Sequence, residues 1–295
     1  MLPGGAGAAP GHAAVAGAGL PMSPSYRLLV ADIDGTLITG DRLITPGVRA
    51  AVQAAQDSGV RVCLATGRMW RSAEPYFRGL RADSPAILYN GGLVYDFRTG
   101  VELRRIHLDH GHARAVLEIL RGIPEVQPHL FVGDRVYTGE MNEITERYRR
   151  KDGLEVTAVG DLLAFLPSNP MKILIIGARP DLRRVAAAIA RQPMPINTVF
   201  SEETYLEILP AGSSKGMALR FVADHLGIPL AETIAVGDNL NDLEMIRIAG
   251  LGVAMGNAPE EVKSHAGYVA LTNEQEGLAD VIHRFVLGGE HRATT

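Results

Sequence analysis

The sequence predicts an α/β fold, in which a doubly wound, mostly parallel sheet is interrupted by an inserted α+β unit. Short apolar runs typical of buried parallel strands alternate with helical segments in the first and last parts of the chain. Between about residues 108 and 203 the pattern changes to short strands in hairpins with separate helices, which is typical of an antiparallel unit. We therefore expect a Rossmann-like core, with functional groups gathered at one edge of its sheet, and a smaller second domain.

Length and composition limit the possible classes of protein. With 295 residues, 46% of them hydrophobic and 21% charged, the chain has material for about two ordinary globular domains. Its net charge of −4 lacks the basic excess of a nucleic-acid-binding protein. No apolar stretch approaches the roughly 20 residues that cross a membrane. The one cysteine, Cys63, lies in an apolar run, which excludes a disulfide framework and favours a reducing, cytoplasmic location.

The two ends of the chain differ from the rest. Residues 1–25 are almost wholly Gly, Ala and Pro without early positive charge, so we expect a disordered tail rather than a secretory signal. Met22 is then an alternative start of the natural protein. The remaining chain divides into a core of residues 26–107 and 204–288, an insertion of residues 108–203, and a final tail of residues 289–295.

The elements of the core follow from apolar runs and from helix and turn signals. Residues 28–31 predict the first buried strand, and a helix begins at Thr45-Pro46 because proline suits the first helical position. Residues 60–65 and 86–89 predict two further parallel strands, and residues 93–106 a hairpin. After the insertion the alternation returns, with strands near 233–236, 252–255 and 268–270 and helices that end near 226, 249 and 286.

The insertion has fewer signals, and they come from hairpins and amphipathic helices. We expect helices near residues 113–120, 143–151 and 181–191. A hairpin over residues 130–137 and strands near 171–176, 198–200 and 205–208 complete the expected unit.

Two carboxylates follow the first strand directly. Residues two apart in an extended segment share a face, so Asp32 and Asp34 project together, roughly 7 Å apart at the Cα atoms, and Gly35 lets the chain turn. Carboxylates this close raise each other's pKa unless a cation lies between them, and hard oxygen ligands suit Mg²⁺. The alternative interpretation is an Asp-Gly turn after a core strand.

A second acidic strand end lies far along the chain. The strand near residues 233–236 leads to Asp238, which can supply a further carboxylate to the same metal ion. Asp242, one helical turn later, is placed behind the metal ligands, where it can orient one of them or a bound water. The alternative for this segment is a polar N-cap of the following helix.

Two other segments offer groups that bind phosphate. Thr66 and Gly67, at a strand end before a helix, present a hydroxyl and free backbone N–H groups. Lys215 opens a helix and is one of four lysines beside 25 arginines, and its ammonium can neutralise both a carboxylate and a phosphoryl group. A Thr-Gly pair is common, and a solvated lysine at a helix start is the alternative for Lys215.

Together these segments resemble the motifs of the haloacid dehalogenase superfamily, over about residues 26–287. Residues 32–37 are similar to its first motif, Thr66 to its second, Lys215 to its third and residues 237–242 to its fourth. Within the superfamily, Asn90-Gly91-Gly92, Ser214-Lys215-Gly216 and Gly256-Asn257-Ala258 are similar to the Cof-type phosphatases, whose large α/β cap of type II B the insertion resembles.

The resemblance implies a two-step phosphoryl transfer. Asp32 is then the nucleophile that forms an aspartyl-phosphate, and Asp34 protonates the leaving oxygen and later activates water. Mg²⁺ is implied on the Asp32 carboxylate, the Asp34 carbonyl and Asp238. Thr66, Gly67, Lys215 and Asn241 are implied as ligands of the phosphoryl group.

The expected substrate is a small phosphorylated metabolite, with sugar phosphates first and flavin, pyridoxal or nucleotide phosphates next. We expect a monomer or homodimer without nucleic-acid or membrane partners. A phosphohexomutase on the same core is an alternative, as is a sensor that binds a phosphorylated ligand without turnover.

Several conspicuous residues have simpler explanations. His107, His110 and His112 suggest zinc, but they lie where the chain crosses into the insertion, and a polar hinge is expected. Arg68 and Glu207 either touch substrate or form surface pairs. Trp70 either lines the pocket or packs the start of its helix, and packing is the favoured interpretation. The basic run of residues 147–151 predicts a solvated helix face.

Overall fold

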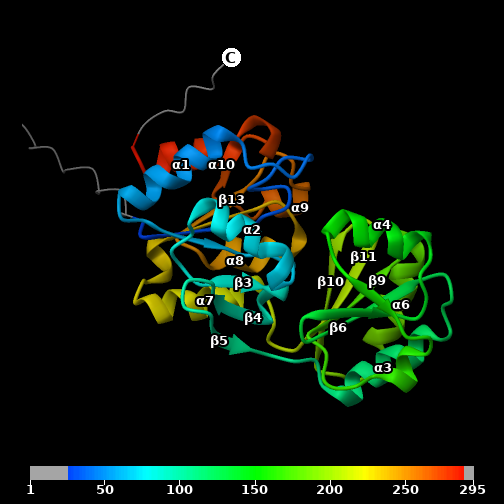
Figure 1. Ribbon diagram of the computed structural model, residues 1–295. Coiled ribbons are helices and arrows are strands. Elements are labelled where there is room, and N and C mark those ends of the chain that lie inside the picture. Colours follow the sequence, from blue (N-terminus) through cyan, green and yellow to red (C-terminus); the bar gives the residue numbers. More distant parts are fainter. Residues whose placement is uncertain (1–25, 289–295) are drawn as a thin grey trace, which may run out of the picture.

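The computed structural model describes residues 26–288 and shows two units, a core and a smaller cap that appears green in Figure 1. The expected tails, residues 1–25 and 289–295, and the alternative start at Met22 lie outside the described residues. Within residues 26–288, no helix has the length and apolar character needed to cross a membrane.

The core is built on a five-stranded parallel sheet in the order β14-β13-β12-β1-β2. Its strand β1 (Leu28–Ala31) is buried on both faces, which explains the continuous apolar run. Ala31 of β1 is in register with Val236 of β12, so the segments that follow these two strands leave the same edge side by side. The other strands are β2 (Arg61–Leu64), β12 (Thr233–Gly237), β13 (Leu251–Ala254) and β14 (Tyr268–Val269).

Helices cover both faces of this sheet, as the predicted doubly wound fold requires. Leu29 and Ala31 pack with helix α1 (Pro46–Asp57) and with α10 (Gly277–Phe285). Leu28 and Val30, on the opposite face, pack with α7 (Lys215–Leu226). The remaining core helices are α2 (Trp70–Leu80), α8 (Leu243–Ile248) and α9 (Glu260–Lys263).

The segment expected as a third parallel strand differs from the prediction. Strand β3 (Ala86–Leu88) belongs to a separate antiparallel sheet with β4 (Leu93–Asp96) and β5 (Val101–Arg105), and one bridge between Ala65 and Ile87 links it to β2. Tyr89, Asn90 and Gly91 all have positive φ, so the chain reverses at once and returns beside β3. The β4–β5 hairpin itself was predicted and is confirmed.

The cap contains a six-stranded sheet in the order β10-β11-β9-β6-β7-β8, antiparallel except for the pair β7–β8. One face packs against α3 (His110–Leu120), α5 (Leu162–Phe165) and α6 (Arg179–Ala190). The opposite face contributes to the same apolar cluster as the core. The other elements are β6 (Gln127–Val132), β7 (Arg135–Thr138), α4 (Glu143–Asp152), β8 (Val156–Ala158), β9 (Lys172–Ile176), β10 (Ile196–Glu202) and β11 (Tyr205–Pro210).

The boundary expected between residues 203 and 204 cuts through this sheet. Strand β11 is fully buried and pairs with β10 on one side and β9 on the other, so it belongs to the cap. A hairpin places it there, because residues 203 and 204 form the turn between β10 and β11. The chain returns to the core after β11, in residues 211–214, just before α7 begins.

Candidate active site

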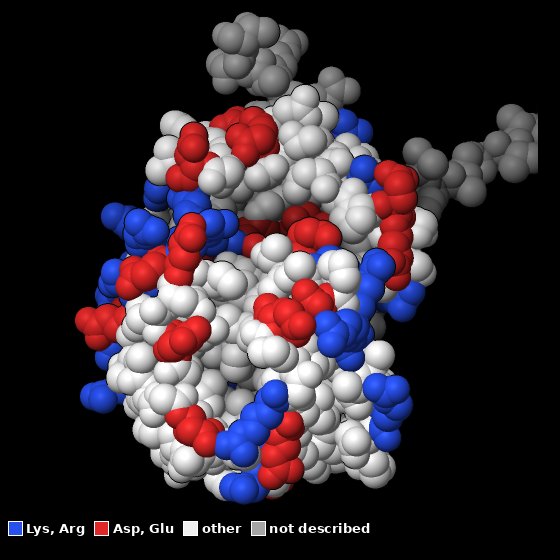
Figure 2. All heavy atoms as spheres, turned by 90° about the vertical axis from the view of Figure 1, so that its right-hand side faces the viewer, with Lys and Arg blue, Asp and Glu red and all other residues white. Residues whose placement is uncertain are grey.

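A cleft of about 340 Å³ lies between the carboxyl edge of the core sheet and the cap. Figure 2 shows a hollow on this side of the molecule with carboxylate groups set back inside it. Six of the predicted site residues line the cleft: Asp32, Asp34, Thr66, Gly67, Asp238 and Asn241. Two others, Lys215 and Asp242, lie fully buried beside it.

The buried ammonium of Lys215 joins two of the predicted carboxylates. Its Nζ lies 2.8 Å from Oδ1 of Asp32 and 2.6 Å from Oδ1 of Asp242. Burial alone lowers the pKa of Lys215, but Asp242 and Asp32 outweigh this effect and raise it, so the ammonium stays charged. The alternative of a solvated lysine at a helix start is therefore wrong, because Lys215 is fully buried.

Asp242 also organises the loop that carries Asp238. Its second oxygen, Oδ2, accepts hydrogen bonds from the backbone N–H groups of Asp238 and Asn239, both at 3.0 Å. Asn239 and Asp242 form a capping box at the start of a 3-10 turn, so the N-cap interpretation holds as well. Both Asp242 oxygens thus have partners within the protein, and Asp242 fixes the positions of Lys215 and Asp238.

Asp238 lies against the turn that follows Asp32. Its Oδ1 accepts a hydrogen bond from the Thr36 hydroxyl at 3.3 Å. Gly35 has φ of +73°, and a Cβ there would lie 2.3 Å from Asp238 Oδ2, so glycine is required for this close approach. Burial, and then the negative charge of Asp242, raise the pKa of Asp238 to about 7.

These carboxylates fit a divalent cation. One oxygen each of Asp32, Asp238 and Asp242 lie within 4.8 Å of one another, and an all-oxygen set suits a hard ion such as Mg²⁺. Because both Asp242 oxygens already accept hydrogen bonds, Asp32 and Asp238 are the better ligands. Among the described residues His107, His110 and His112 form no comparable group, and Asp109 beside them caps α3.

Asp34 forms a bidentate ion pair with an arginine. The Arg68 guanidinium donates Nε to Oδ2 and Nη2 to Oδ1 of Asp34, at 2.7 and 2.6 Å. Burial raises the pKa of Asp34, but these hydrogen bonds and the positive charge of Arg68 outweigh burial and lower it. Arg68 lines the cleft with its side chain nearly buried, and its ion pair is with the half-exposed Asp34.

The predicted phosphate ligands lie on adjoining turns. Thr66 is buried, and its hydroxyl accepts a hydrogen bond from the backbone N–H of Arg68 at 3.1 Å. Asn241 donates Nδ2 to Oδ1 of Asn90 at 2.9 Å, while its own Oδ1 is buried without a partner among residues 26–288. Gly67 faces Asn90, whose Nδ2 would lie 3.0 Å from a Cβ at position 67.

The cap forms the other wall of the cleft. Tyr148, Lys151 and Asp152 of α4 line it together with Glu202 and Tyr205. The prediction of a solvated face for residues 147–151 is wrong at Tyr148. This residue is buried, because one side of α4 packs against the cap sheet. This wall combines aromatic rings with charged side chains, a surface suited to a polar organic group.

Besides the cap wall, Arg42, Asn257 and Lys172 belong to the site and were not assigned to it from the sequence. Arg42 lines the cleft and pairs with Asp152 of the cap at 2.9 Å. Asn257 donates Nδ2 to the Gly35 carbonyl at 2.9 Å and supports the turn after Asp32. Lys172 had a detectable signal, since a charged residue at the start of the apolar run 171–176 is rare in a buried strand.

Comparison with known proteins agrees with this architecture. The profile of the haloacid dehalogenase-like hydrolases matches residues 29–282. A putative phosphatase, YxeH of Bacillus subtilis, is 32% identical, over 89% of this chain and 99% of its own. The 5-amino-6-(5-phospho-D-ribitylamino)uracil phosphatase YcsE of Bacillus subtilis is 31% identical, over 88% and 96%.

Comparison with solved structures indicates the same family. The crystal structure of a haloacid dehalogenase-like hydrolase from Bacteroides thetaiotaomicron superposes with a TM-score of 0.79 at 30% identity, covering 88% of this chain and 99% of that one. The family match spans core and cap together and includes every predicted site residue. The chain therefore belongs to the haloacid dehalogenase-like hydrolases, and it is a phosphatase of that family.

Proposed function

We propose that this protein hydrolyses small phosphate monoesters with the help of Mg²⁺ and through an aspartyl-phosphate on Asp32. The observation that supports this most is the convergence of Asp32, Asp238 and Lys215, from three distant parts of the chain, at one end of the cleft. Such a group offers a nucleophile, a metal site and a fixed positive charge at one place.

Asp32 is the proposed nucleophile. In the first step its carboxylate oxygen forms a bond to phosphorus while the bond from phosphorus to the leaving oxygen breaks. Lys215, 2.8 Å away, keeps Asp32 oriented and offsets the charge of the transferring group. In the second step a water oxygen attacks phosphorus, the bond to Asp32 breaks, and inorganic phosphate leaves.

Asp34 is the proposed acid and base. It gives a proton to the leaving oxygen in the first step and takes one from water in the second. The bidentate Arg68 contact favours the carboxylate form, which is the form that the second step needs. For the first step Asp34 must take up a proton and turn from Arg68 toward the leaving oxygen.

Mg²⁺ is the proposed cofactor, held by the Asp32 and Asp238 carboxylates with the Asp34 carbonyl implied as a third ligand. When bound, it polarises a phosphoryl oxygen and offsets negative charge among the carboxylates. Thr66, Gly67, Lys215 and Asn241 are the proposed ligands of the other phosphoryl oxygens. Thr66 and Gly67 lie on the turn after β2 and Asn241 on the turn after β12, so these ligands come from the two strands that flank β1, which leads to Asp32.

The proposed substrates are sugar phosphates and related polyol phosphates. The cap wall offers Tyr148 and Tyr205 for stacking, and Lys151 paired with Glu202 for hydrogen bonds to hydroxyl groups. The name of the relative YcsE describes a phosphate ester of a polyol chain, which supports this choice. The single cysteine, buried and free, supports a reducing compartment such as the cytoplasm.

A panel assay tests the proposal. Purified protein is incubated with hexose, ribitol, pyridoxal, flavin and nucleotide phosphates, with Mg²⁺ or with EDTA, and released phosphate is measured. We expect turnover of at least one ester, loss of turnover in EDTA and its return with excess Mg²⁺. Isomerised sugar phosphate formed faster than free phosphate would indicate a mutase, and binding without turnover would indicate a sensor.

A further inference from the structure

A buried ion pair in the cap contacts the phosphate-binding side of the core. Lys172 of β9 and Glu207 of β11 share a face of the cap sheet, since Glu207 lies opposite Leu174, two residues from Lys172. Lys172 Nζ lies 2.7 Å from Glu207 Oε2, and each side chain is only 5% exposed. The ammonium also lies 4.8 Å from the ring centroid of Phe131.

Both partners make hydrogen bonds across to the core. Lys172 Nζ donates to the Gly67 carbonyl at 2.9 Å. Glu207 Oε2 accepts from Asn90 Nδ2 at 3.1 Å, and Asn90 Oδ1 accepts from Asn241 Nδ2 at 2.9 Å. The contact is tight, because a Cβ on Gly67 would lie 3.3 Å from Glu207 Oε1. A continuous polar chain therefore runs from the cap sheet to Gly67 and Asn241.

Holding the cap on the core does not require this buried pair. Burying two charges is costly, and apolar residues of similar size would fill the space at least as favourably. An ion pair at the rim, Arg42 with Asp152 at 2.9 Å, already joins core and cap. The buried pair does what apolar residues cannot, because it fixes the Gly67 peptide plane and the orientation of the Asn90 amide.

We propose that Lys172 and Glu207 are positioning residues, which hold Gly67 and Asn241 in the geometry that binds the phosphoryl group. The cap then completes the phosphate site through the core backbone and a chain of amides, without touching the phosphoryl group itself. This inference rests on the proposed function and deepens it. It separates phosphoryl binding, which depends on the buried pair, from recognition of the leaving group by the rest of the cap wall.

The test removes both charges together, in Lys172→Met/Glu207→Leu, so that no unpaired charge stays buried. Binding of orthovanadate, a mimic of the transferring phosphoryl group, is measured by calorimetry with Mg²⁺. We expect the Kd to rise about tenfold or more, the effect of one lost charge-assisted hydrogen bond. The kcat for two esters with different leaving groups is expected to fall by a common factor, with a smaller change in KM.

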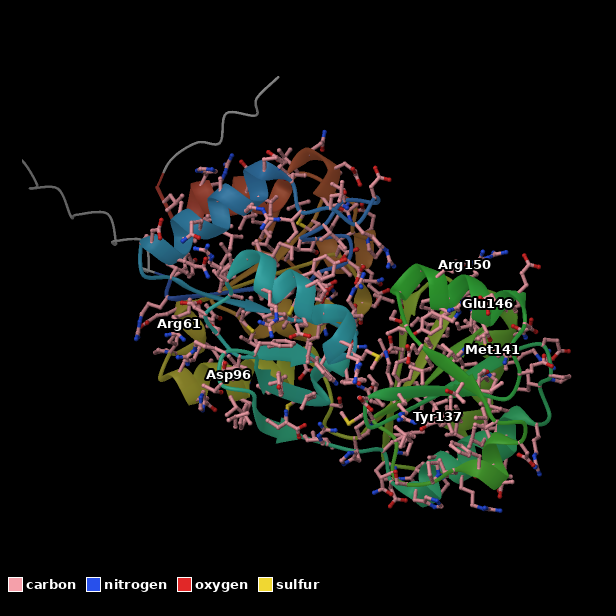
Figure 3. All side chains as sticks on the ribbon, in the orientation of Figure 1. Arg61, Asp96, Tyr137, Met141, Glu146 and Arg150 are labelled. Carbon is pink, nitrogen blue, oxygen red and sulfur yellow. The ribbon has the colours of Figure 1, made fainter. Side chains whose placement is uncertain are left out.

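A matched control removes another ion pair of the cap. Glu146→Ala/Arg149→Ala deletes a pair on α4 whose atoms lie 2.9 Å apart, and Figure 3 shows Glu146 on the side of the cap away from the core. We expect this variant to keep the original vanadate affinity and kcat. It shows how much of any effect comes from loss of an ion pair in the cap as such.

A second variant keeps the test decisive if the double variant fails to fold. Asn90→Gly retains the left-handed backbone, with φ of 51° at this residue, and cuts the chain between Glu207 and Asn241 while the ion pair stays. We expect weaker vanadate binding and lower kcat here too. If vanadate affinity and kcat fall in the double variant alone, the result still supports a positioning role, exerted through the Gly67 carbonyl.

Three results would overturn the proposals in distinct ways. Unchanged vanadate affinity and kcat in both variants, while the unaltered protein hydrolyses esters, would refute the positioning role and leave the proposed function intact. Effects confined to one ester's KM would show that the pair contacts the leaving group instead. An unaltered protein that neither binds vanadate with Mg²⁺ nor hydrolyses any ester would refute both proposals.

Discussion

The ion pair between Arg68 and Asp34 predicts how the pH dependence of turnover responds to mutation. Arg68→Met removes two hydrogen bonds, of 2.7 and 2.6 Å, that stabilise the Asp34 carboxylate. Charge-assisted hydrogen bonds contribute about 1.5 to 3 kcal/mol, and because the Asp34 side chain is 49% exposed we take the lower end. The Asp34 carboxylate loses this stabilisation in the variant.

The direction follows from the role proposed for Asp34. A general acid must carry its proton, so the alkaline limb of kcat/KM reports the pKa of Asp34. Arg68 lowers this pKa, and its removal raises it. The alkaline limb should therefore move to higher pH in Arg68→Met.

The assay compares two substrates and a control variant. A hexose 6-phosphate needs protonation of its leaving oxygen, whereas p-nitrophenyl phosphate has a good leaving group and should show little shift. Arg71→Met is the control, because Arg71 pairs with Asp134 of the cap and not with Asp34. The assignment of Asp34 as the acid held by Arg68 would be refuted if the alkaline limb of kcat/KM for the hexose phosphate stayed in place or moved to lower pH.

Three further variants test the rest of the site. Asp32→Asn should lower kcat by about 10⁴-fold or more in a steady-state assay, because it removes the nucleophile; turnover near the original rate would contradict that role. Lys215→Met leaves Asp32 and Asp242 buried without their cation, so the free energy of unfolding in urea at pH 7 should fall by about 3 to 5 kcal/mol. The loss should shrink as the pH falls and Asp32, whose pKa burial raises, takes up a proton, and a pH-independent loss would point to packing alone. Gly35→Ala places a Cβ 2.3 Å from Asp238 Oδ2 at φ of +73°, so Mg²⁺ affinity measured by calorimetry should weaken about tenfold or more. Unchanged affinity would remove Asp238 from the metal site.

Much of the core could be predicted from local sequence signals. Residues 28–31 and 234–236 are continuous apolar runs, because their strands are buried on both faces, and each run is followed within two residues by an acid. Parallel strands present their carboxyl ends at one sheet edge, which is why Asp32 and Asp238 could be expected together. Local sequence signals do not predict the order of the strands in the sheet, which makes β1 and β12 direct neighbours.

Other features depend on contacts between distant segments. Strand β3 has an apolar run like its neighbours, and the three residues with positive φ that turn it away from the parallel sheet include Tyr89, which gives no turn signal. The sequence of β11 suits a strand of the core as well as one of the cap. Only its pairing with β9 and β10 assigns it to the cap. The partner of Arg68 is 34 residues away and that of Lys172 is 35, beyond any local pattern.

The covalent intermediate gives the most direct test of the whole account. A ³²P-labelled ester that the protein turns over is mixed with it in Mg²⁺, the reaction is stopped in acid within milliseconds, and the labelled peptide is identified by mass spectrometry. We predict acid-stable, alkali-labile label on Asp32, formed as fast as product and absent when EDTA replaces Mg²⁺. Phosphate release at full rate with no label on the protein, or with label on another residue, would contradict it.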